Sequence, residues 1–367
     1  MKKYILLLLL MSFGLYLKAQ DTTRVLFIGN SLTYFNNMPQ TFEAIANSKG
    51  DPTIVTMHAP GGTGFSHHIT NPTVFNYFRQ GNWDYIVLQP GSNESPGYSE
   101  PINSTLTRAR ILKDSINLYN PCAKVLYYEI SYGVWGNTEA NLTSYNNTMD
   151  LIRTNLEYLA DSTKSYFAPA GEVIRKAWNT DQSIMLWGGV GDIHPNSIGS
   201  YMIACTFYST IYQKNSFGTN ITTSLTPTEA SYYQQLADSI VLNHFSDWRI
   251  NTYNSFTDFN YTINQSNVTF TSTSENIDSL HWNFGDGNFS NSTPSNHTYN
   301  QSNDYTVTLS TYKDGCLDTR TKTIFPEEFI LPFETDIKSY VFGNLTITQT
   351  QIKKIFRCIK PRFEISC

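Results

Sequence analysis

The feature that most constrains the fold is an alternation of two kinds of segment between Arg24 and Trp248. Short runs of β-branched or aliphatic residues are separated by longer segments whose apolar residues recur with a helical period. This pattern is typical of βαβ units, since parallel strands need long crossover connections. It predicts a parallel sheet of five strands, at Val25–Ile28, Thr53–Met57, Tyr85–Leu88, Lys124–Ile130 and Ser165–Ala168.

The intervals between these strands predict helices. Pro39 suits the first turn of one helix and Gly50 its end, because proline favours helix starts and glycine favours helix ends. Longer helices are predicted at Ile102–Tyr119, Glu139–Leu159, Ser197–Tyr212 and Thr226–Phe245. We therefore expect an α/β domain over residues 20–250.

The composition and periodicity of the chain change after Tyr253. Thr, Ser and Asn alternate with aromatic residues and Val, turn residues recur every ~10 residues, and no helical period is present. This predicts a small all-β module at residues 255–325. The remaining residues, 326–367, form a tail that the sequence does not assign.

The first residues indicate export. A positive start at Met1–Lys3 precedes the apolar run Tyr4–Leu17, and Ala19 is a suitable small residue at a cleavage position. The run is too short for a membrane span, which needs ~20 apolar residues. We expect a signal peptide at residues 1–19, no stable membrane insertion, and a secreted, periplasmic or cell-surface protein.

Composition narrows the class of protein further. Charged residues make up 15% of the chain and apolar residues 40%, which argues against disorder. The net charge of -5 argues against nucleic acid as a partner. The five cysteines are an odd number in a long chain and do not indicate a disulfide framework. Cys122 and Cys205 are expected to be buried thiols, and the spacing permits a bridge between Cys358 and Cys367.

A candidate nucleophile lies just after the first predicted strand. Ser31 follows Gly29 in a small-residue turn at the carboxyl edge of the sheet, where ligand sites of open α/β sheets form. A helix starting there would direct amide groups toward an anion. The alternative is an ordinary turn in which Ser31 caps the helix.

Two further segments follow the second and third predicted strands. The glycine-rich turn around Gly62 offers a backbone amide to an oxyanion, although it lacks the ending of a phosphate-binding loop. Asn93 offers an uncharged side-chain N–H, and Gln89 is the second choice for this role. Plain surface turns are the alternative for both segments.

A candidate base precedes the helix predicted at Ser197. His194 is suited to take a proton from a hydroxyl near neutral pH, and Asp192 could orient its ring. A solvated loop histidine beside an unrelated aspartate is the alternative. Glu129, near the end of the fourth strand, either lines the same pocket or is a buried capping carboxylate.

A hydrolytic zinc site is a competing hypothesis for this edge. His58, His67, His68, His194 and Asp192 supply suitable ligand types. Neighbouring His67 and His68 would point to opposite sides of an extended segment, and no His-x-x-x-His pair exists. We therefore expect no metal and no cofactor.

Taken together, the four segments resemble the SGNH or GDSL-like hydrolase superfamily. The most specific parts are Ile28–Leu32, His194–Asn196 and Gly199. The resemblance implies a three-layer α/β/α, flavodoxin-like domain that cleaves esters, frequently of acylated carbohydrate or lipid.

The same resemblance implies a role for each residue. Ser31 would attack an ester carbonyl, His194 would remove its proton, and Asp192 would orient His194. The amides of Ser31 and Gly62 and the side chain of Asn93 would form the oxyanion hole.

Three positions depart from the family pattern. Asn30 and Glu94 each stand where the family has an aspartate. Asp192 lies two residues before His194 instead of three, and Gly191 occupies the family position. Either the loop is rebuilt so that Asp192 still reaches the ring, or a backbone carbonyl orients the base in a Ser-His dyad.

The second module has its own signature. The run His281–Gly287 joins an alternating strand to a Gly-Asp-Gly turn, and His297 and Tyr299 follow. We expect Trp282 and Phe284 to share the buried face. The run resembles a PKD domain, an immunoglobulin-like sandwich, which implies spacing or binding to polysaccharide or protein surfaces.

The sequence thus predicts a secreted serine esterase, whose expected substrate is an acylated (acetylated) carbohydrate. The alternative is a non-catalytic surface-binding protein on a hydrolase scaffold.

Overall fold

The computed structural model describes residues 22–326, 339–342 and 345–348, and these divide into two compact units. The first unit ends at Asn254 and also includes Asp314–Cys316. The second comprises Ser255–Lys313 and the residues from Leu317 onward. The predicted signal peptide lies outside the described residues.

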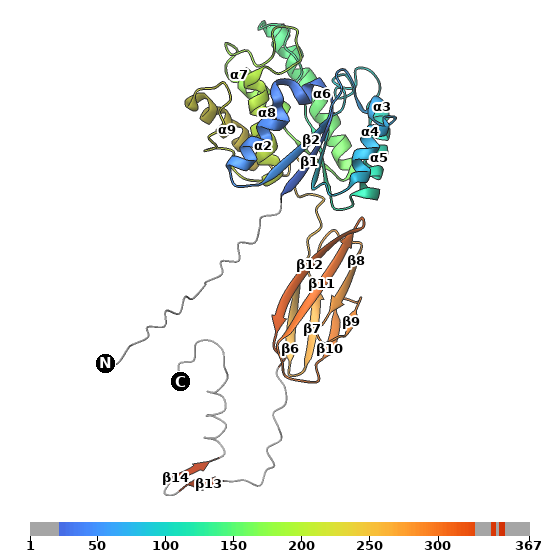
Figure 1. Cartoon of the computed structure of the whole chain (residues 1–367), viewed down its shortest axis with the longest axis vertical. Coiled ribbons are helices and arrows are strands. Elements are labelled where there is room, and N and C mark those ends of the chain that lie inside the picture. The colour runs from blue at the N-terminus through green and yellow to red at the C-terminus, as the bar shows by residue number, and fades with distance from the viewer. Residues whose placement is uncertain (1–21, 327–338, 343–344, 349–367) are drawn as a thin grey trace, which may run out of the picture. The chain divides into compact units, whose positions relative to one another are not determined.

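The first unit is built on a five-stranded parallel sheet with the order β2-β1-β3-β4-β5 (Figure 1). The predicted flavodoxin-like fold is confirmed, since this is the strand order of that class. Strand β1 is buried over its last four residues, as a strand covered on both faces requires. The strands are β1 (Thr23–Ile28), β2 (Thr53–His58), β3 (Tyr85–Leu88), β4 (Lys124–Tyr128) and β5 (Tyr166–Ala168).

Helices cover both faces of this sheet, with α3 to α5 on one side and α2, α8 and α9 on the other (Figure 1). The helices are α1 (Ser31–Tyr34), α2 (Met38–Ser48), α3 (Phe65–His68), α4 (Pro72–Gln80), α5 (Ile102–Tyr119), α6 (Glu139–Thr163), α7 (Ala170–Thr180), α8 (Ser197–Tyr212) and α9 (Pro227–Leu242), with a 3-10 turn at Phe35–Asn37. Helix α6 runs past the predicted Leu159, and α9 ends before the predicted Phe245. Helix α1 begins at Ser31, where the sequence analysis considers a helix start, but the sequence did not predict α3, α4 or α7.

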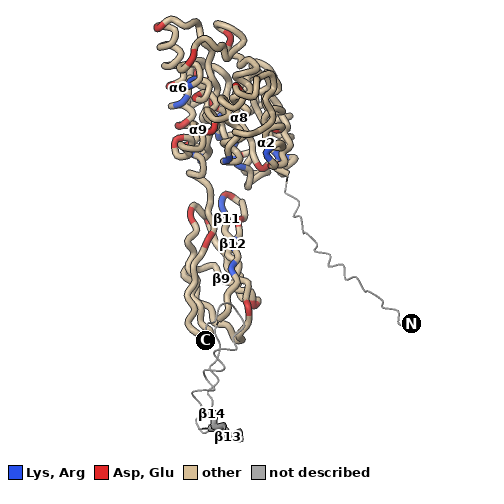
Figure 2. The backbone as a smooth tube through the Cα atoms, turned by 90° about the vertical axis from the view of Figure 1, so that its left-hand side faces the viewer, with Lys and Arg blue, Asp and Glu red and all other residues tan. Residues whose placement is uncertain are grey.

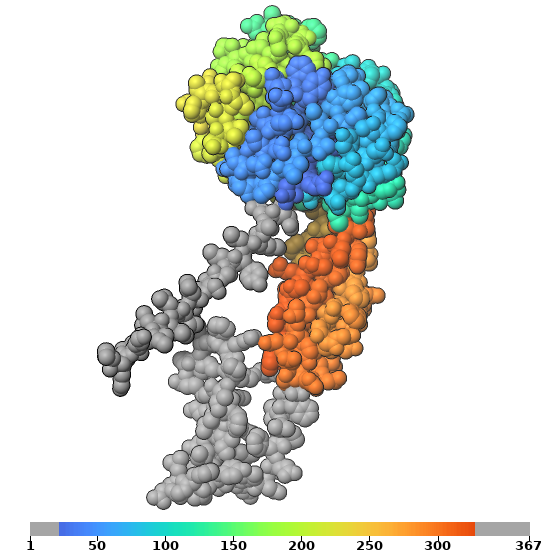
Figure 3. Space-filling model, viewed as in Figure 1, coloured from blue at the N-terminus to red at the C-terminus, as the bar shows by residue number. Residues whose placement is uncertain are grey.

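Helix α8 is the centre of one helical layer. It is buried from Gly199 to Ile211, because α2 and α9 pack on it while it packs on the sheet. Phe207 contacts Phe27 of β1 and Tyr128 of β4 edge-on, with ring centroids 5.1 and 5.2 Å apart. In the space-filling view the segment that contains α2, in blue, lies between α9, in yellow, and the cyan α3–α5 region (Figure 3). This layer places the start of α8 beside the carboxyl edge of the sheet.

The second unit contains two antiparallel sheets, in the orders β10-β7-β6 and β12-β11-β8-β9. Trp282 and Phe284 are both buried in its core, as predicted. The Trp282 ring packs edge-on against Phe259 at 5.0 Å, and its Nε1 donates to the carbonyl of Ser292. The strands are β6 (Phe259–Asn264), β7 (Asn267–Ser272), β8 (Ser279–Asn283), β9 (Phe289–Ser290), β10 (Ser295–Thr298), β11 (Tyr305–Lys313) and β12 (Cys316–Ile324), and the tail adds β13 (Ser339–Phe342) and β14 (Leu345–Thr348).

The cysteine prediction is correct in one place and wrong in another. Cys205 is a buried thiol, and burial raises its pKa to about 12. Cys122 is not a thiol, because it forms a disulfide with Cys316. A sequence separation of 194 residues hides such a pair from any argument based on spacing. Cys358 and Cys367 lie outside the described residues.

Charged residues of both signs are interspersed along the described chain, in keeping with the low net charge (Figure 2). Among the described helices, none has both the length and the apolar character that a membrane crossing requires.

The packing of α8 predicts a large effect for Phe207→Ala. The substitution should lower the free energy of unfolding of the first unit by about 3–5 kcal/mol, because it leaves a cavity between helix and sheet. Urea unfolding of the full chain, followed by circular dichroism at 222 nm, reports this unit, since all helices of the described residues lie there. Phe217→Ala, at an exposed phenylalanine of the same unit, should change it by less than about 1 kcal/mol. Equal effects of the two variants would contradict the assignment of α8 to the core.

Candidate active site

Three loops meet at the carboxyl edge of the parallel sheet. The last residues of β1, β2 and β3 are paired in register, so the loops that follow them start side by side. These loops carry Ser31, Gly62 and Asn93 respectively. The edge is where open α/β sheets bind ligands, and the register explains why segments far apart in sequence gather there.

The turn that presents Ser31 depends on a close approach at Gly29. A Cβ at this position would lie 2.3 Å from Thr33 Oγ1 and 2.7 Å from Gln89 Oε1, which no real side chain tolerates. Glycine therefore allows β1 to end in a tight turn against β3, and helix α1 begins directly at Ser31.

Asn30 links this turn to the glycine-rich loop. Its Oδ1 accepts from the Leu32 amide at 2.9 Å and caps α1, while its Nδ2 donates to the Thr63 carbonyl at 2.7 Å. An aspartate could make the first of these bonds but not the second, because a carboxylate has no N–H. The departure from the family pattern at Asn30 thus adds a tie between the loops of Ser31 and Gly62.

Ser31, His194 and Asp192 form a continuous chain of hydrogen bonds. Ser31 Oγ lies 2.9 Å from His194 Nε2, and His194 Nδ1 lies 2.7 Å from Asp192 Oδ1. Hydrogen bonds from His194, its backbone amide foremost, lower the pKa of Asp192 and keep the carboxylate ionised. A hydroxyl, a base and an orienting carboxylate in this order can generate a nucleophile near neutral pH.

A tight turn allows the Asp192 carboxylate to reach the ring of His194, although the two residues are separated by only one position. Asp192 Oδ1 also accepts from the His194 backbone amide at 2.9 Å, so the carboxylate folds back over its own turn. Gly188 makes room for it, since a Cβ there would meet Asp192 Oδ2 at 2.2 Å. An isolated bridge between Trp187 and Pro195 fixes the base of the turn. Of the two arrangements that the sequence left open, the geometry matches the rebuilt loop.

Two residues that the sequence analysis missed hold His194 from the other side. The Phe35 ring stacks on the imidazole at 4.2 Å with an interplanar angle of 20°. Asn36 Nδ2 donates to the Pro195 carbonyl at 2.8 Å, and Asn36 has a φ of 50°. Asparagine is among the few residues that adopt this left-handed conformation readily, and the pair Asn36–Asn37 was the available signal.

The two predicted oxyanion donors differ in how they are held. Gly62 is exposed, with a φ of 71°, and space is open around it. Asn93 is also exposed, and its Oδ1 accepts from Tyr132 Oη at 3.4 Å. Because the oxygen of the Asn93 amide is engaged, its NH2 group is oriented away from Tyr132. Tyr132 is a further site residue that the sequence analysis missed.

Gln89, the second choice as oxyanion donor, has a different place. Its side chain is completely buried, its Oε1 accepts from the Asn30 amide and from Thr33 Oγ1, and its Nε2 donates to the Pro90 carbonyl at 2.6 Å. A buried amide with these partners braces the Ser31 turn. The geometry therefore favours Asn93 over Gln89.

Glu94 ties the loops after β2 and β3 together. Its buried carboxylate accepts from the amides of Phe65, Ser66 and Gly91 at 2.7, 3.0 and 2.8 Å. Arg108 Nη1 lies 3.3 Å from the same carboxylate and compensates its charge. The longer side chain of glutamate, in place of the family aspartate, spans both loops and holds Gly62 and Asn93 on one frame.

His68 is a structural residue under the Ser31 turn. Its side chain is fully buried, and its Nε2 donates to the Gly29 carbonyl at 3.0 Å. Burial is the largest cause that lowers its pKa, to about 4, so the ring is neutral in the folded protein at pH 7.

His58, His67 and His68 lie together, with ring centroids 6.0 Å apart for His58 and His68 and 5.6 Å apart for His67 and His68, but His194 is not part of this group. The expectation of an extended segment is wrong here, because His67 and His68 lie in helix α3. His58 Nε2 and His67 Nε2 lie 3.2 and 3.0 Å from the Asn71 side-chain nitrogen, whereas His194 is engaged with Ser31 and Asp192. Among the described residues, no group of three His, Cys, Asp or Glu side chains has the geometry to hold a metal ion.

Glu129 belongs to the core and does not line the site. It is buried, pairs with Arg153 Nε at 2.7 Å, and accepts from the Glu172 amide in the first turn of α7. Of its two predicted roles, the structure supports the buried capping carboxylate.

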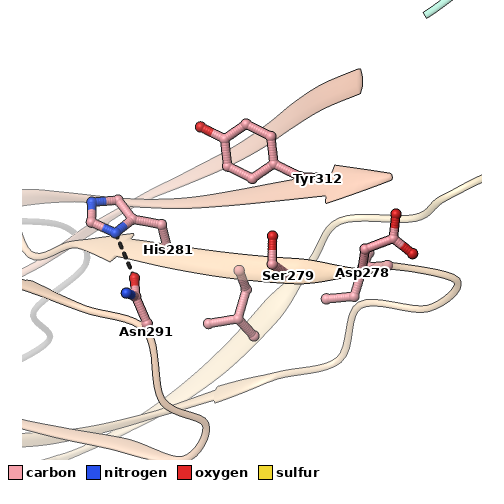
Figure 4. A pocket seen from close by; sticks show the side chains of 7 residues that line it. Asp278, Ser279, His281, Asn291 and Tyr312 are labelled. Atoms are coloured by element: carbon pink, nitrogen blue, oxygen red, sulfur yellow. Dashed lines mark hydrogen bonds between the residues drawn. The ribbon is translucent and has the colours of Figure 1, made fainter. Parts of the chain in front are cut away.

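The second unit carries a hollow of about 720 Å³ on the face of β8 and β11 (Figure 4). His281 and Tyr312 flank it, and His281 Nδ1 lies 2.7 Å from Asn291 Oδ1. Its lining residues are Ile277, Asp278, Ser279, Leu280, His281, Asn291 and Tyr312.

Residues 257–325 match the family model of the PKD domain, in agreement with the resemblance seen in the sequence. A solved PKD1 domain from the Vibrio cholerae metalloprotease PrtV is similar, with 30% identity over 19% of this chain and 94% of that chain and a TM-score of 0.19.

Solved structures also resemble the first unit. A DUF4886 family protein from Bacteroides uniformis covers 60% of this chain and 95% of its own, with 18% identity and a TM-score of 0.51. A putative SGNH hydrolase from Slackia heliotrinireducens covers 52% of this chain and 100% of its own, with 20% identity and a TM-score of 0.42. The first of these two similarities shows that the first unit has a similar fold to the DUF4886 family protein. No curated protein matches the chain.

The burial of His68 predicts a pH-dependent contribution to stability. Because its folded pKa lies below its unfolded value of 6.5, the unfolded chain binds this proton more readily, and stability falls as pH falls from 6.5 toward 4. Between pH 7 and 4.5 this group should cost the folded protein about 2 kcal/mol. His68→Gln keeps a donor for the Gly29 carbonyl and should remove that part of the pH dependence.

Urea unfolding at both pH values measures the difference between the variant and the unmodified chain. His244→Gln, at an exposed histidine outside the cluster of His58, His67 and His68, serves as the control and should leave the difference between the two pH values unchanged. If His68→Gln and the unmodified chain lose the same free energy on acidification, His68 is not a neutral buried histidine.

Proposed function

We propose that the first unit is a serine esterase that hydrolyses an acyl ester of a carbohydrate. The observation that carries the proposal is the hydrogen-bonded chain from Ser31 through His194 to Asp192, set among amide donors at the carboxyl edge of the sheet. The resemblance of the four segments to SGNH hydrolases supports ester cleavage as the reaction.

In the proposed acylation step, Ser31 Oγ attacks the ester carbonyl carbon while His194 Nε2 takes the hydroxyl proton. The new Oγ–C bond gives a tetrahedral intermediate, and Asp192 stabilises the imidazolium. The C–O bond to the alcohol then breaks, and His194 returns the proton to the leaving oxygen. Water, activated by the same base, releases the acid from Ser31.

The oxyanion of this intermediate would accept hydrogen bonds from the amides of Ser31 and Gly62 and from Asn93 Nδ2. One such preorganised donor typically contributes about 3 kcal/mol to the lowering of the barrier. The Glu94 carboxylate supports this role, because it fixes the loops that carry Gly62 and Asn93.

Export and surface association complete the proposal. The apolar start of the chain supports a signal peptide at residues 1–19, and the disulfide between Cys122 and Cys316 suits an oxidising compartment. The PKD domain would act as a spacer or as a binder of polysaccharide or protein surfaces.

Replacement of the nucleophile tests the function directly. Ser31→Ala should lower kcat/KM for short-chain acyl esters by roughly 10⁵-fold or more and abolish labelling by a phosphonate probe, because no other hydroxyl contacts His194 Nε2 in the described residues. Peptide mapping of the labelled full chain should locate the adduct at Ser31. The alternative of a non-catalytic binding protein would instead be supported if the chain hydrolyses no ester, Ser31 is not labelled, and the chain is retained on a polysaccharide column.

Replacement of the orienting acid distinguishes a triad from a dyad. Asp192→Ala should lower kcat by roughly 10⁴-fold while KM changes little, because the ring of His194 loses the partner of its Nδ1. Asp181→Ala, at an exposed aspartate of the same unit, should leave kcat unchanged. A loss below tenfold for Asp192→Ala would mean that the base works without this carboxylate.

A further inference from the structure

Trp135 stands apart from the other tryptophans of the chain. Its side chain is 61% exposed, whereas the other five of the six tryptophans are at most 4% exposed. An exposed indole does not contribute the favourable free energy that burial of a large aromatic side chain gives to the fold. The exposed indole is therefore available to contact a ligand.

The indole is anchored on the turn that carries the acid and the base. A Cβ at Gly191 would lie 3.1 Å from the Trp135 ring, so the ring covers the residue just before Asp192. The Gly191 amide donates to the Val134 carbonyl at 2.8 Å, and Asn141 Nδ2 donates to the Trp135 carbonyl at 3.0 Å. These bonds fix the loop after β4 against the Asp192–His194 turn.

The chemistry of ester cleavage assigns the two sides of the site. The carbonyl oxygen must face the donors around Gly62 and Asn93, whereas the leaving oxygen must lie within reach of His194 Nε2, which returns the proton. The alcohol part of the ester thus extends over the side that carries His194. The exposed ring of Trp135 packs against Gly191 on that side.

We propose that Trp135 is the binding platform for the alcohol part of the substrate and that this alcohol is a pyranose ring. The inference rests on the esterase function proposed above and deepens it. A pyranose presents a face of C–H groups to the indole and a rim of hydroxyls to polar neighbours. The residues beside Trp135 are polar and exposed, with Asn137, Thr138 and Glu139 following it, which suits a sugar better than a lipid chain.

A comparison of two acetate esters tests the platform. We expect Trp135→Ala in the full chain to lower the ratio of kcat/KM for a monoacetylated methyl pyranoside to that for ethyl acetate by about tenfold, mainly through KM. Trp135→Tyr should restore most of the ratio, because it restores an aromatic face. Val190→Ala, at a 62% exposed residue of the neighbouring turn, is the matched control and should leave the ratio unchanged.

Several outcomes would overturn the proposal. An unchanged ratio would mean that Trp135 does not contact the sugar, and an equal loss on both esters would mean that it only supports the loop. A larger loss on dodecyl acetate than on the pyranoside would indicate a lipid-like alcohol.

A binding measurement separates this proposal from the esterase function. Saturation-transfer NMR should detect the acetylated pyranoside on Ser31→Ala, and the signal should disappear in Ser31→Ala combined with Trp135→Ala. If the unmodified chain has no esterase activity while binding still depends on Trp135, the esterase is refuted and the platform is retained. Binding that persists without Trp135 would refute the platform.

Discussion

The parallel register of β1 with its two neighbours is the constraint on which the candidate site depends. Because β2 and β3 end level with β1, three loops from different parts of the chain begin at one edge. Backbone hydrogen bonds continue past the strands, from the Gly29 amide to the His58 carbonyl and from the Gln89 amide to the Ile28 carbonyl. A slip of one strand would separate the groups that have to act together.

Buried polar groups then convert this proximity into a defined geometry. Gln89, Glu94 and His68 each bond to the backbone of a loop other than their own, and each is almost wholly buried. A buried polar group costs free energy unless it is bonded, so each side chain fixes both its own position and that of the loop it contacts. The loops of the candidate site are consequently held in place by buried side chains that are not themselves exposed at the site.

The sequence predicted the parts of this structure that are local or periodic. The five strands follow from short β-branched or aliphatic runs. Ser31 follows from a motif at a strand end, and Asp192 and His194 follow from a motif just before α8. The helices that were missed are short or begin directly after a strand, as α7 does after β5. Their apolar residues give too few turns to establish a period.

What the sequence did not predict depends on contacts between distant segments. The stacking of Phe35 on His194 joins residues that no local pattern relates, as does the disulfide between Cys122 and Cys316. Gln89 looked like a donor to the ligand because its position in the chain places it at the edge. Only the fold reveals that its amide turns inward to the Ser31 turn.

The short spacing of Asp192 and His194 has a consequence for how the base is positioned against Ser31. Acid and base sit on one small turn, held by bonds within that turn, so their mutual geometry does not rely on the sheet. A displacement of the turn therefore moves acid and base together and changes their distance to Ser31 while their own separation stays the same. The contacts of the turn with Phe35, Asn36 and Val134 then decide how close the base lies to the serine.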